Sequence, residues 1–175
     1  LGDCHDSLTE LSCLSADILQ SYRGLGLAKA VTILAACELG RRRAMEHASQ
    51  QRMDNPKAIA DYFRPKLQDK AHEECHLMFL RNNLTYMGSI RVSQGGITSS
   101  AVDVRQVLRE AILRQCTAIV FCHNHPSGTL VPSRQDKELT HRLVEACKAV
   151  DIALIDHVIV SSQGYYSFSE EGTLC

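Results

Sequence analysis

The spacing of apolar residues changes once along this chain, and the change divides the expected fold into two parts. In residues 1–50 the apolar positions recur only at helical spacing. Beyond Asp69, short apolar runs alternate with amphipathic helical stretches, which is typical of an α/β domain. We therefore predict a small all-helical domain over residues 1–50, a linker within the polar stretch His47–Asn55, and an α/β domain over residues 53–175.

One apolar run of the predicted α/β domain, Thr117–Cys122, contains no charged residue. Such a run is typical of a strand in the centre of a sheet that is covered on both faces. A loop with two prolines and a glycine is predicted after it, over His123–Pro132. The other predicted strands are Leu77–Leu80, Leu84–Val92, Ile152–Val160 and Tyr165–Phe168. The predicted helices include Leu27 to about Arg43, Pro56 to about Leu67, Val104–Ile112 and a last helix whose apolar stripe runs from Leu139 to Val150.

The composition excludes several classes of protein. With 45% hydrophobic and 22% charged residues, and with no apolar run near the roughly 20 residues that cross a bilayer, we expect a globular protein and no membrane partner. The net charge of -1 provides no overall cationic field for nucleic acid. The eight cysteines form no C-x-x-C pair, so we expect mostly buried thiols in a reducing compartment, the cytoplasm. The same absence excludes the zinc deaminases, which use P-C-x-x-C.

Two histidines follow the uncharged strand directly. His123 and His125 are two positions apart, so on an extended chain their rings point to the same side. The turn at Pro126-Ser127-Gly128 then reverses the chain, and Ser133 and Asp136 open the next helix, so a carboxylate returns to the strand end. Two histidines and one carboxylate leave one tetrahedral position free, as catalytic zinc requires.

Each half of this pattern has a simpler interpretation when it is taken alone. Ser133-x-x-Asp136 before an apolar stripe is also a capping box, and capping is then the favoured interpretation. The pair His123 and His125 is ambiguous without a further ligand. All four features are expected at one place: the strand end, the two histidines, the reversing loop and the aspartate. Their combination therefore favours a metal site. Capping is compatible with chemistry, since the Ser133 hydroxyl could donate to a developing oxyanion.

The spacing His123-x-His125, seven residues, then Ser133-x-x-Asp136 resembles the JAMM (MPN+) metalloprotease motif, and His-Asn-His-Pro-Ser-Gly is similar to its form in the bacterial RadC family. The resemblance implies an α/β fold, a mixed sheet flanked by helices with JAMM/MPN-like, cytidine-deaminase-like layering. It also implies Zn²⁺ held by His123, His125 and Asp136. The expected activity is hydrolysis of a peptide or isopeptide bond.

The resemblance further implies an upstream glutamate that acts on the attacking water. In RadC-like proteins this residue opens the first long strand, eight residues before its polar end, and counting back from Arg81 gives Glu73. Glu74 would face the other side of a strand, so only one of the two can serve. We assign proton transfer to Glu73 and stabilisation of the oxyanion to Ser133.

Two further residues lie close to the motif in the expected sheet. Cys122 should alternate away from the two ligand histidines and belong to the core. His157 in a late apolar strand is more often a structural histidine, although the pair Asp156-His157 could lie beside the site.

The helical part supplies the second functional hypothesis. Gly24-Leu25-Gly26 resembles the hairpin of a RadC-type helix-hairpin-helix, in which Gly24 and Gly26 let backbone N–H groups approach a DNA phosphate and Lys29 adds charge. The alternative is a helix-turn-helix that only packs. If the hairpin binds DNA, the protein could be a DNA-repair module whose metal site is secondary. The complete set of ligands, serine and glutamate favours the enzyme.

Overall fold

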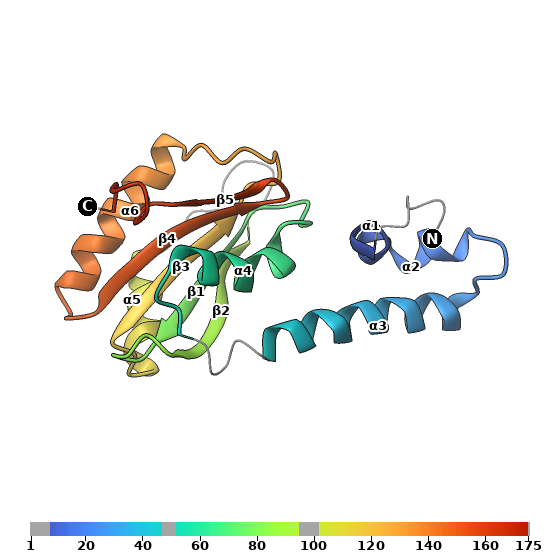
Figure 1. The fold of residues 1–175 in the computed structure, drawn as a ribbon, viewed down its shortest axis with the longest axis horizontal. Coiled ribbons are helices and arrows are strands. Elements are labelled where there is room, and N and C mark those ends of the chain that lie inside the picture. The colour runs from blue at the N-terminus through green and yellow to red at the C-terminus, as the bar shows by residue number, and fades with distance from the viewer. Residues whose placement is uncertain (1–7, 47–51, 95–101, 175) are drawn as a thin grey trace. The chain divides into compact units, whose positions relative to one another are not determined.

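The computed structural model describes residues 8–46, 52–94 and 102–174, which belong to two compact units (Figure 1). One unit lies within residues 1–47 and the other within residues 48–175. Residues 47–51 of the predicted linker fall outside the described part. Among the described residues, no helix is both long enough and apolar enough to span a membrane.

The first unit is helical throughout its described part, as predicted. It consists of α1 (Leu8–Cys13), α2 (Ala16–Gln20) and α3 (Leu27–Glu46), and both short helices contact α3. Ser15 caps α2 by accepting a hydrogen bond from the backbone of Ile18. The chain turns into α3 at Gly24, whose φ of +86° suits glycine.

The second unit is built on a five-stranded mixed sheet, which confirms the predicted fold class. Its strands lie in the order β2-β1-β3-β4-β5, and β3 is parallel to β4 while the other neighbours are antiparallel. The elements in chain order are α4 (Pro56–Leu67), β1 (Glu74–Leu80), β2 (Tyr86–Gln94), α5 (Val104–Leu113), β3 (Ala118–Asn124), α6 (Arg134–Lys148), β4 (Ala153–Ser161) and β5 (Gly164–Ser167).

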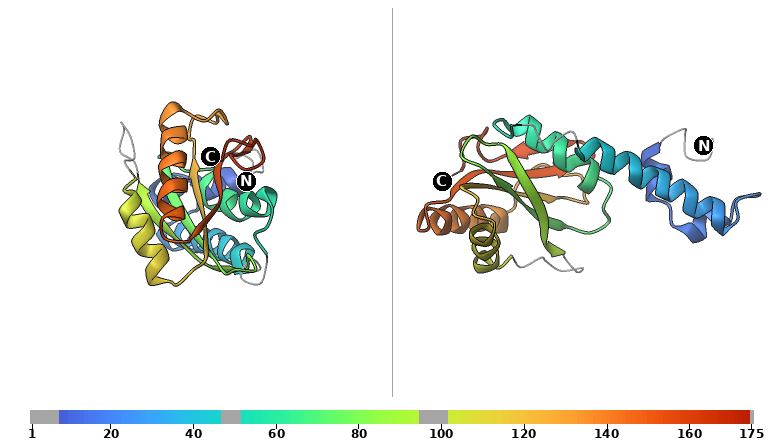
Figure 2. Two further views of the ribbon diagram at one scale, coloured as in Figure 1. Left: turned by 90° about the vertical axis from the view of Figure 1, so that its left-hand side faces the viewer. Right: turned by 90° about the horizontal axis from the view of Figure 1, so that it is seen from below.

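Helices cover both faces of the sheet (Figure 2). We call the side under α4 the α4 face; its core includes Phe63, Met78, Val120, Cys122 and Val158. The side under α5 and α6 is the α6 face, with a core that includes Leu77, Phe79, Val107, Phe121 and Leu143. Successive residues of a strand alternate between the two faces, so sequence parity assigns each side chain to one core. Cys122 lies in the α4-face core, as predicted.

Among the boundaries that differ from the predictions, three have a clear physical reason. β3 continues through Asn124, because His123 pairs with Cys75 on one side and with Ile159 on the other, so the predicted loop begins two residues later. The end of the predicted linker belongs to the second unit, since Met53 is fully buried and its N–H donates to the Leu84 carbonyl. β2 begins at Tyr86 because Leu84, at a φ of +61°, still belongs to the turn.

An irregularity in β4 changes the parity of that strand. Ile119 pairs with Leu154, but the next residue, Val120, pairs with Asp156. Leu154 packs on the α6 face, and strict alternation from it would place His157 on the α4 face. Because of the shift, His157 lies on the α6 face, where its ring meets Phe121 edge to face.

Candidate metal centre

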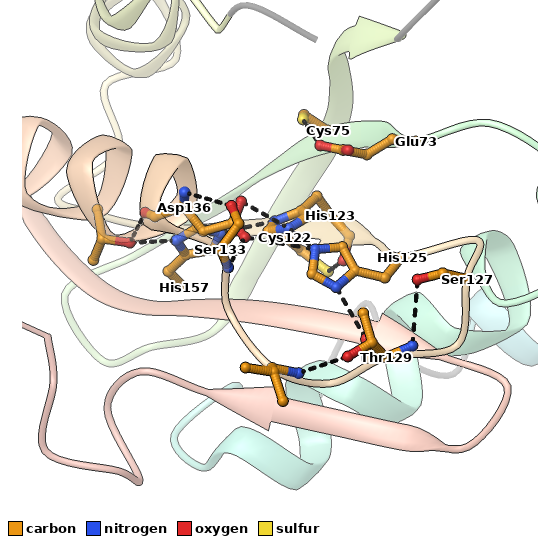
Figure 3. Close-up of polar contacts among 12 residues, drawn as sticks. Glu73, Cys75, Cys122, His123, His125, Ser127, Thr129, Ser133, Asp136 and His157 are labelled. Carbon is orange, nitrogen blue, oxygen red and sulfur yellow. Dashed lines mark hydrogen bonds and ion pairs between the residues drawn. The ribbon is translucent and has the colours of Figure 1, made fainter. Parts of the chain in front are cut away.

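Three side chains meet at the carboxyl end of β3 (Figure 3). His123 lies within the strand, His125 follows it, and Asp136 lies in the first turn of α6. The Nε2 atoms of the two histidines are 3.0 Å apart. Asp136 Oδ1 lies 3.3 Å from His123 Nε2, and Asp136 Oδ2 lies 3.6 Å from His125 Nε2. One ligand atom of each residue lies within 4.8 Å of those of the other two, so the three face a common point.

The donor set fits a tetrahedral metal ion. Ligand atoms about 2.0–2.1 Å from zinc at tetrahedral angles are separated by roughly 3.3 Å. The two distances from His123 Nε2, 3.0 Å to His125 Nε2 and 3.3 Å to Asp136 Oδ1, are close to this value. The side chain of His123 is 1% exposed, whereas those of His125 and Asp136 are each 12% exposed. The three residues could hold a metal ion.

The charges of the site suit a cation. Burial alone would raise the pKa of Asp136, but the imidazoles of His123 and His125 beside its carboxylate outweigh burial and hold this pKa below its usual value. The Asp136 carboxylate beside the ring raises the pKa of His125, against the opposite effect of burial. Asp136 is therefore an anion at neutral pH and faces two ring nitrogens.

The helix cap orients the Asp136 carboxylate. Ser133 Oγ accepts from the Asp136 N–H at 3.1 Å, and Asp136 Oδ2 accepts from the Ser133 N–H at 2.7 Å, which completes a capping box. Capping, the simpler interpretation of this pair, is thus present. It does not compete with the metal interpretation, because the cap holds the carboxylate where both histidines face it.

His125 is held by the loop that follows β3. Its backbone N–H donates to the Val160 carbonyl, and its Nδ1–H donates to the Thr129 carbonyl at 2.9 Å. The loop closes at Gly128, where φ is +84° and an added Cβ would lie 3.2 Å from the Gln163 side chain. Since Nδ1 is used as a donor to a carbonyl, the neutral ring presents the lone pair of Nε2 to the common point.

A cavity of about 460 Å³ opens over the three residues. Its lining comes from β1, β3 and α6, from residues next to these elements, and from the segment before α5. The lining residues are Glu73, Cys75, Val102, Phe121, His123, His125, Ser133, Gln135, Asp136, Glu138, Leu139 and Arg142. The structure therefore places Glu73 and Ser133 in one cavity with the candidate ligands. Glu73 lies one residue before β1, at a position of α6-face parity, beside Cys75 (Figure 3).

Glu74 belongs to the other face of the sheet. It is 6% exposed and does not line the cavity. Its carboxylate lies 3.1 Å from His76 Nε2 and within 3.7 Å of the Lys70 and Arg91 side chains. Burial raises the pKa of Glu74, but these partners outweigh it, so the net direction is downward.

The sequence analysis leaves the role of His157 undecided, and the structure places this residue beside the candidate ligands. It is fully buried, with Nε2 2.9 Å from His123 Nδ1 and Nδ1 2.6 Å from Thr140 Oγ1. Its ring stacks on Phe168 with centroids 4.6 Å apart. Burial lowers the pKa of His157 well below the usual value, so the ring is neutral. No sequence spacing identifies this contact, because the register shift in β4 produces it.

The residues of the predicted hairpin lie in the first unit. Gly24 and Gly26 precede α3, and no heavy atom lies within 4 Å of a Cβ built on either one. Lys29 Nζ donates to the Gly24 carbonyl at 2.8 Å, which closes the turn from the helix side. Contact with DNA through this turn stays a prediction.

The chain is similar to proteins of one family along most of its length. A family model described as RadC-like JAB domain matches residues 53–173. A UPF0758 protein of Flavobacterium johnsoniae is 37% identical over 167 residues, which are 95% of this chain and 73% of that protein. UPF0758 proteins of Symbiobacterium thermophilum and Streptococcus sanguinis are 38% and 36% identical, over 91% and 94% of this chain and 68% and 73% of their own length.

Proposed function

The chain belongs to the family of RadC-like JAB domain proteins, and from this premise we propose that it is a zinc-dependent metallohydrolase that cleaves a peptide or isopeptide bond. The family and the donor set point to metal-dependent hydrolysis. The proposal adds two details to this reaction class, namely that the metal is zinc and that the substrate is an amide.

One observation carries the proposal: Glu73 and Ser133 line the same cavity as His123, His125 and Asp136. A metal site that only stabilises a fold is closed by four protein ligands. Here three candidate ligands line a cavity that is also lined by a carboxylate and a hydroxyl. This arrangement suits a site that admits substrate.

The roles follow from the chemistry of each group. Bound at these ligands, zinc would supply Lewis acidity and lower the pKa of a water molecule toward about 7. Glu73 accepts a proton from the attacking water and returns it to the leaving amine. Ser133 Oγ accepts from the Asp136 N–H, so its own proton stays available to donate to the oxyanion of the tetrahedral intermediate.

The first test is metal content. Purified protein incubated with zinc is expected to retain about one zinc per chain by elemental analysis, as three ligands plus water imply. His125→Ala and Asp136→Ala each remove one ligand and should lose stoichiometric zinc. Circular dichroism provides the folding control. Zinc-loaded protein should then hydrolyse members of a panel of peptide and isopeptide substrates, and the ligand variants should not.

The outcomes separate the parts of the proposal. Wild-type protein that binds no zinc at neutral pH would overturn it, and the DNA-binding hypothesis for the helical unit would become the better account. Zinc that persists in folded variants lacking His125 or Asp136 would show that the metal binds elsewhere. Zinc binding without hydrolysis of any amide would leave a metal centre with a different reaction.

A further inference from the structure

A row of buried hydrogen bonds runs behind the candidate ligand His123 and ends at the helix that carries Asp136. His123 Nδ1 lies 2.9 Å from His157 Nε2, and His157 Nδ1 lies 2.6 Å from Thr140 Oγ1. Thr140 Oγ1 in turn donates to the backbone carbonyl of Asp136 at 2.7 Å. His123 thus lies between His125, at its Nε2, and His157, at its Nδ1 (Figure 3).

The protons of this row can be assigned by counting donors. A carbonyl oxygen only accepts, so the single hydroxyl proton of Thr140 is used on Asp136. Thr140 Oγ1 must then accept from His157, which places a proton on His157 Nδ1. Because a neutral imidazole carries one N–H, His157 Nε2 is an acceptor, and it must receive its hydrogen bond from His123 Nδ1–H.

This assignment determines the face that His123 presents to the candidate metal position. When the only ring proton of His123 is on Nδ1, the lone pair lies on Nε2, the atom that is 3.0 Å from His125 Nε2. The Thr129 carbonyl imposes the same tautomer on His125. Two ring nitrogens that both lack a proton repel one another at this distance. A cation bound at both removes the repulsion.

We propose that His157 and Thr140 are positioning residues that hold His123 in the tautomer able to bind a metal and tie this ligand to the helix that carries Asp136. The inference rests on the proposed function, because it assigns a purpose to the buried row only if a metal binds at His123. Partners that fix the tautomer of a ligand histidine usually contribute about 10–100-fold to metal affinity.

A purely structural role would have a different consequence. If Thr140 and His157 only satisfied each other in the core, Thr140→Val would cost folding stability and would leave the affinity for zinc unchanged in the folded protein. In the proposed row the same substitution removes the acceptor for His157 Nδ1–H. His157 then favours the tautomer protonated on Nε2, which cannot accept from His123, and the His123 proton moves to the nitrogen that faces the metal.

The test compares Thr140→Val with Thr140→Ser. Valine keeps the shape of threonine and lacks the hydroxyl, whereas serine keeps the hydroxyl and lacks the methyl group. Zinc affinity is measured by competition with a chromophoric chelator, and thermal unfolding of the metal-free proteins reports stability. We expect about tenfold weaker zinc binding for valine and near-wild-type binding for serine. Affinity that follows the methyl group instead of the hydroxyl would overturn the proposal.

His157→Phe gives the stronger version of the same test. Phenylalanine preserves an aromatic ring against Phe168 but offers no acceptor to His123 Nδ1–H. We expect the affinity for zinc to fall by up to about 100-fold. If this variant fails to fold, the Thr140 pair still decides the question, because those changes at a single helix position are small.

A spectroscopic measurement tests the row without zinc. Long-range ¹H–¹⁵N correlation spectra of the metal-free protein at mildly alkaline pH distinguish protonated from unprotonated ring nitrogens. His123 and His157 are both expected to be protonated on Nδ1 in the wild-type protein and in Thr140→Ser. A proton on Nε2 of either ring in the wild type would refute the assignment.

The two proposals fail in different ways. If the wild-type protein binds no zinc, the metallohydrolase proposal is refuted, but the spectra still test the assignment of the tautomers. A wild-type protein that binds zinc with the same affinity as Thr140→Val refutes only the role of His157 and Thr140.

Discussion

Polar side chains form one cluster on each face of the sheet, and the two clusters are used in opposite ways. On the α4 face they satisfy one another: Tyr62, Lys66 and Ser89 share hydrogen bonds, and Glu74 pairs with His76. On the α6 face the Nε2 atoms of His123 and His125 and the Asp136 carboxylate are directed at one point beneath an open cavity. Polar groups that complete each other's hydrogen bonds stabilise a fold, whereas acceptors directed at one point need a ligand.

Two adjacent glutamates make the comparison specific. Glu73 and Glu74 have the same chemistry, but Glu73 lines the cavity and Glu74 is buried among cationic and imidazole partners. Alternation along the strand is the whole cause of the difference. Exchanging either carboxylate for its neutral amide therefore tests each face at nearly constant shape.

The largest contrast is expected in the rate of hydrolysis. Glu73→Gln removes the group that accepts and returns a proton, so the rate on any substrate identified should fall by about 10²–10⁴-fold while zinc is retained. Elemental analysis of the same preparation checks the metal. Glu74→Gln is the matched control and should keep both zinc and rate. If the two variants lost activity equally, the assignment of catalysis to the α6 face would be wrong.

A smaller effect should separate the two tasks of Ser133. Ser133→Gly removes the hydroxyl but leaves a residue that caps helices nearly as well, whereas Ser133→Ala removes both hydroxyl and cap at a cost of about 1 kcal/mol. We expect the two variants to lose activity alike, by about 10²-fold or more, and only alanine to lower the melting temperature appreciably. Activity that follows the melting temperature would mean that Ser133 acts only through the cap.

Much of the site could be predicted because its main parts are local in sequence. The uncharged run before His123 marks a central strand, the interval of two residues places both rings on one side, and the capping box locates Asp136 at the helix start. Each of these inferences rests on a local regularity, the alternation of side chains along a strand or the capping pattern at a helix start. Tertiary contacts rarely change such regularities. The choice of Glu73 over Glu74 also depended on the family resemblance, because the strand period alone does not show which face of the sheet carries the site.

The relation between His157 and His123 could not be predicted from spacing. Strict alternation from Leu154 assigns His157 to the α4 face, and only the register shift between Ile119 and Val120 brings it behind His123. Thr140 follows Asp136 by four residues, so the helix period does place both on one side of α6. That period gives no reason to connect Thr140 with a strand 17 residues later.

The smallest expected effect concerns stability on the α4 face. Partners of Glu74 lower its pKa in the folded protein, so its carboxylate stabilises the fold at pH values above the usual value of 4.5, and this contribution is lost as the pH falls through the folded pKa. Glu74→Gln should thus lower the free energy of unfolding at neutral pH by about 1 kcal/mol.

Urea denaturation of metal-free wild type and Glu74→Gln, repeated at steps below pH 4.5, measures this difference directly. The two curves should approach one another as the wild-type carboxyl becomes protonated and resembles the amide. Lys70 and Arg91 are half exposed, so most of the effect is expected from the less exposed contact with His76. If the difference in free energy of unfolding stayed constant with pH, its cause would be packing. The charge of Glu74 would then not contribute to the stability of the α4 face.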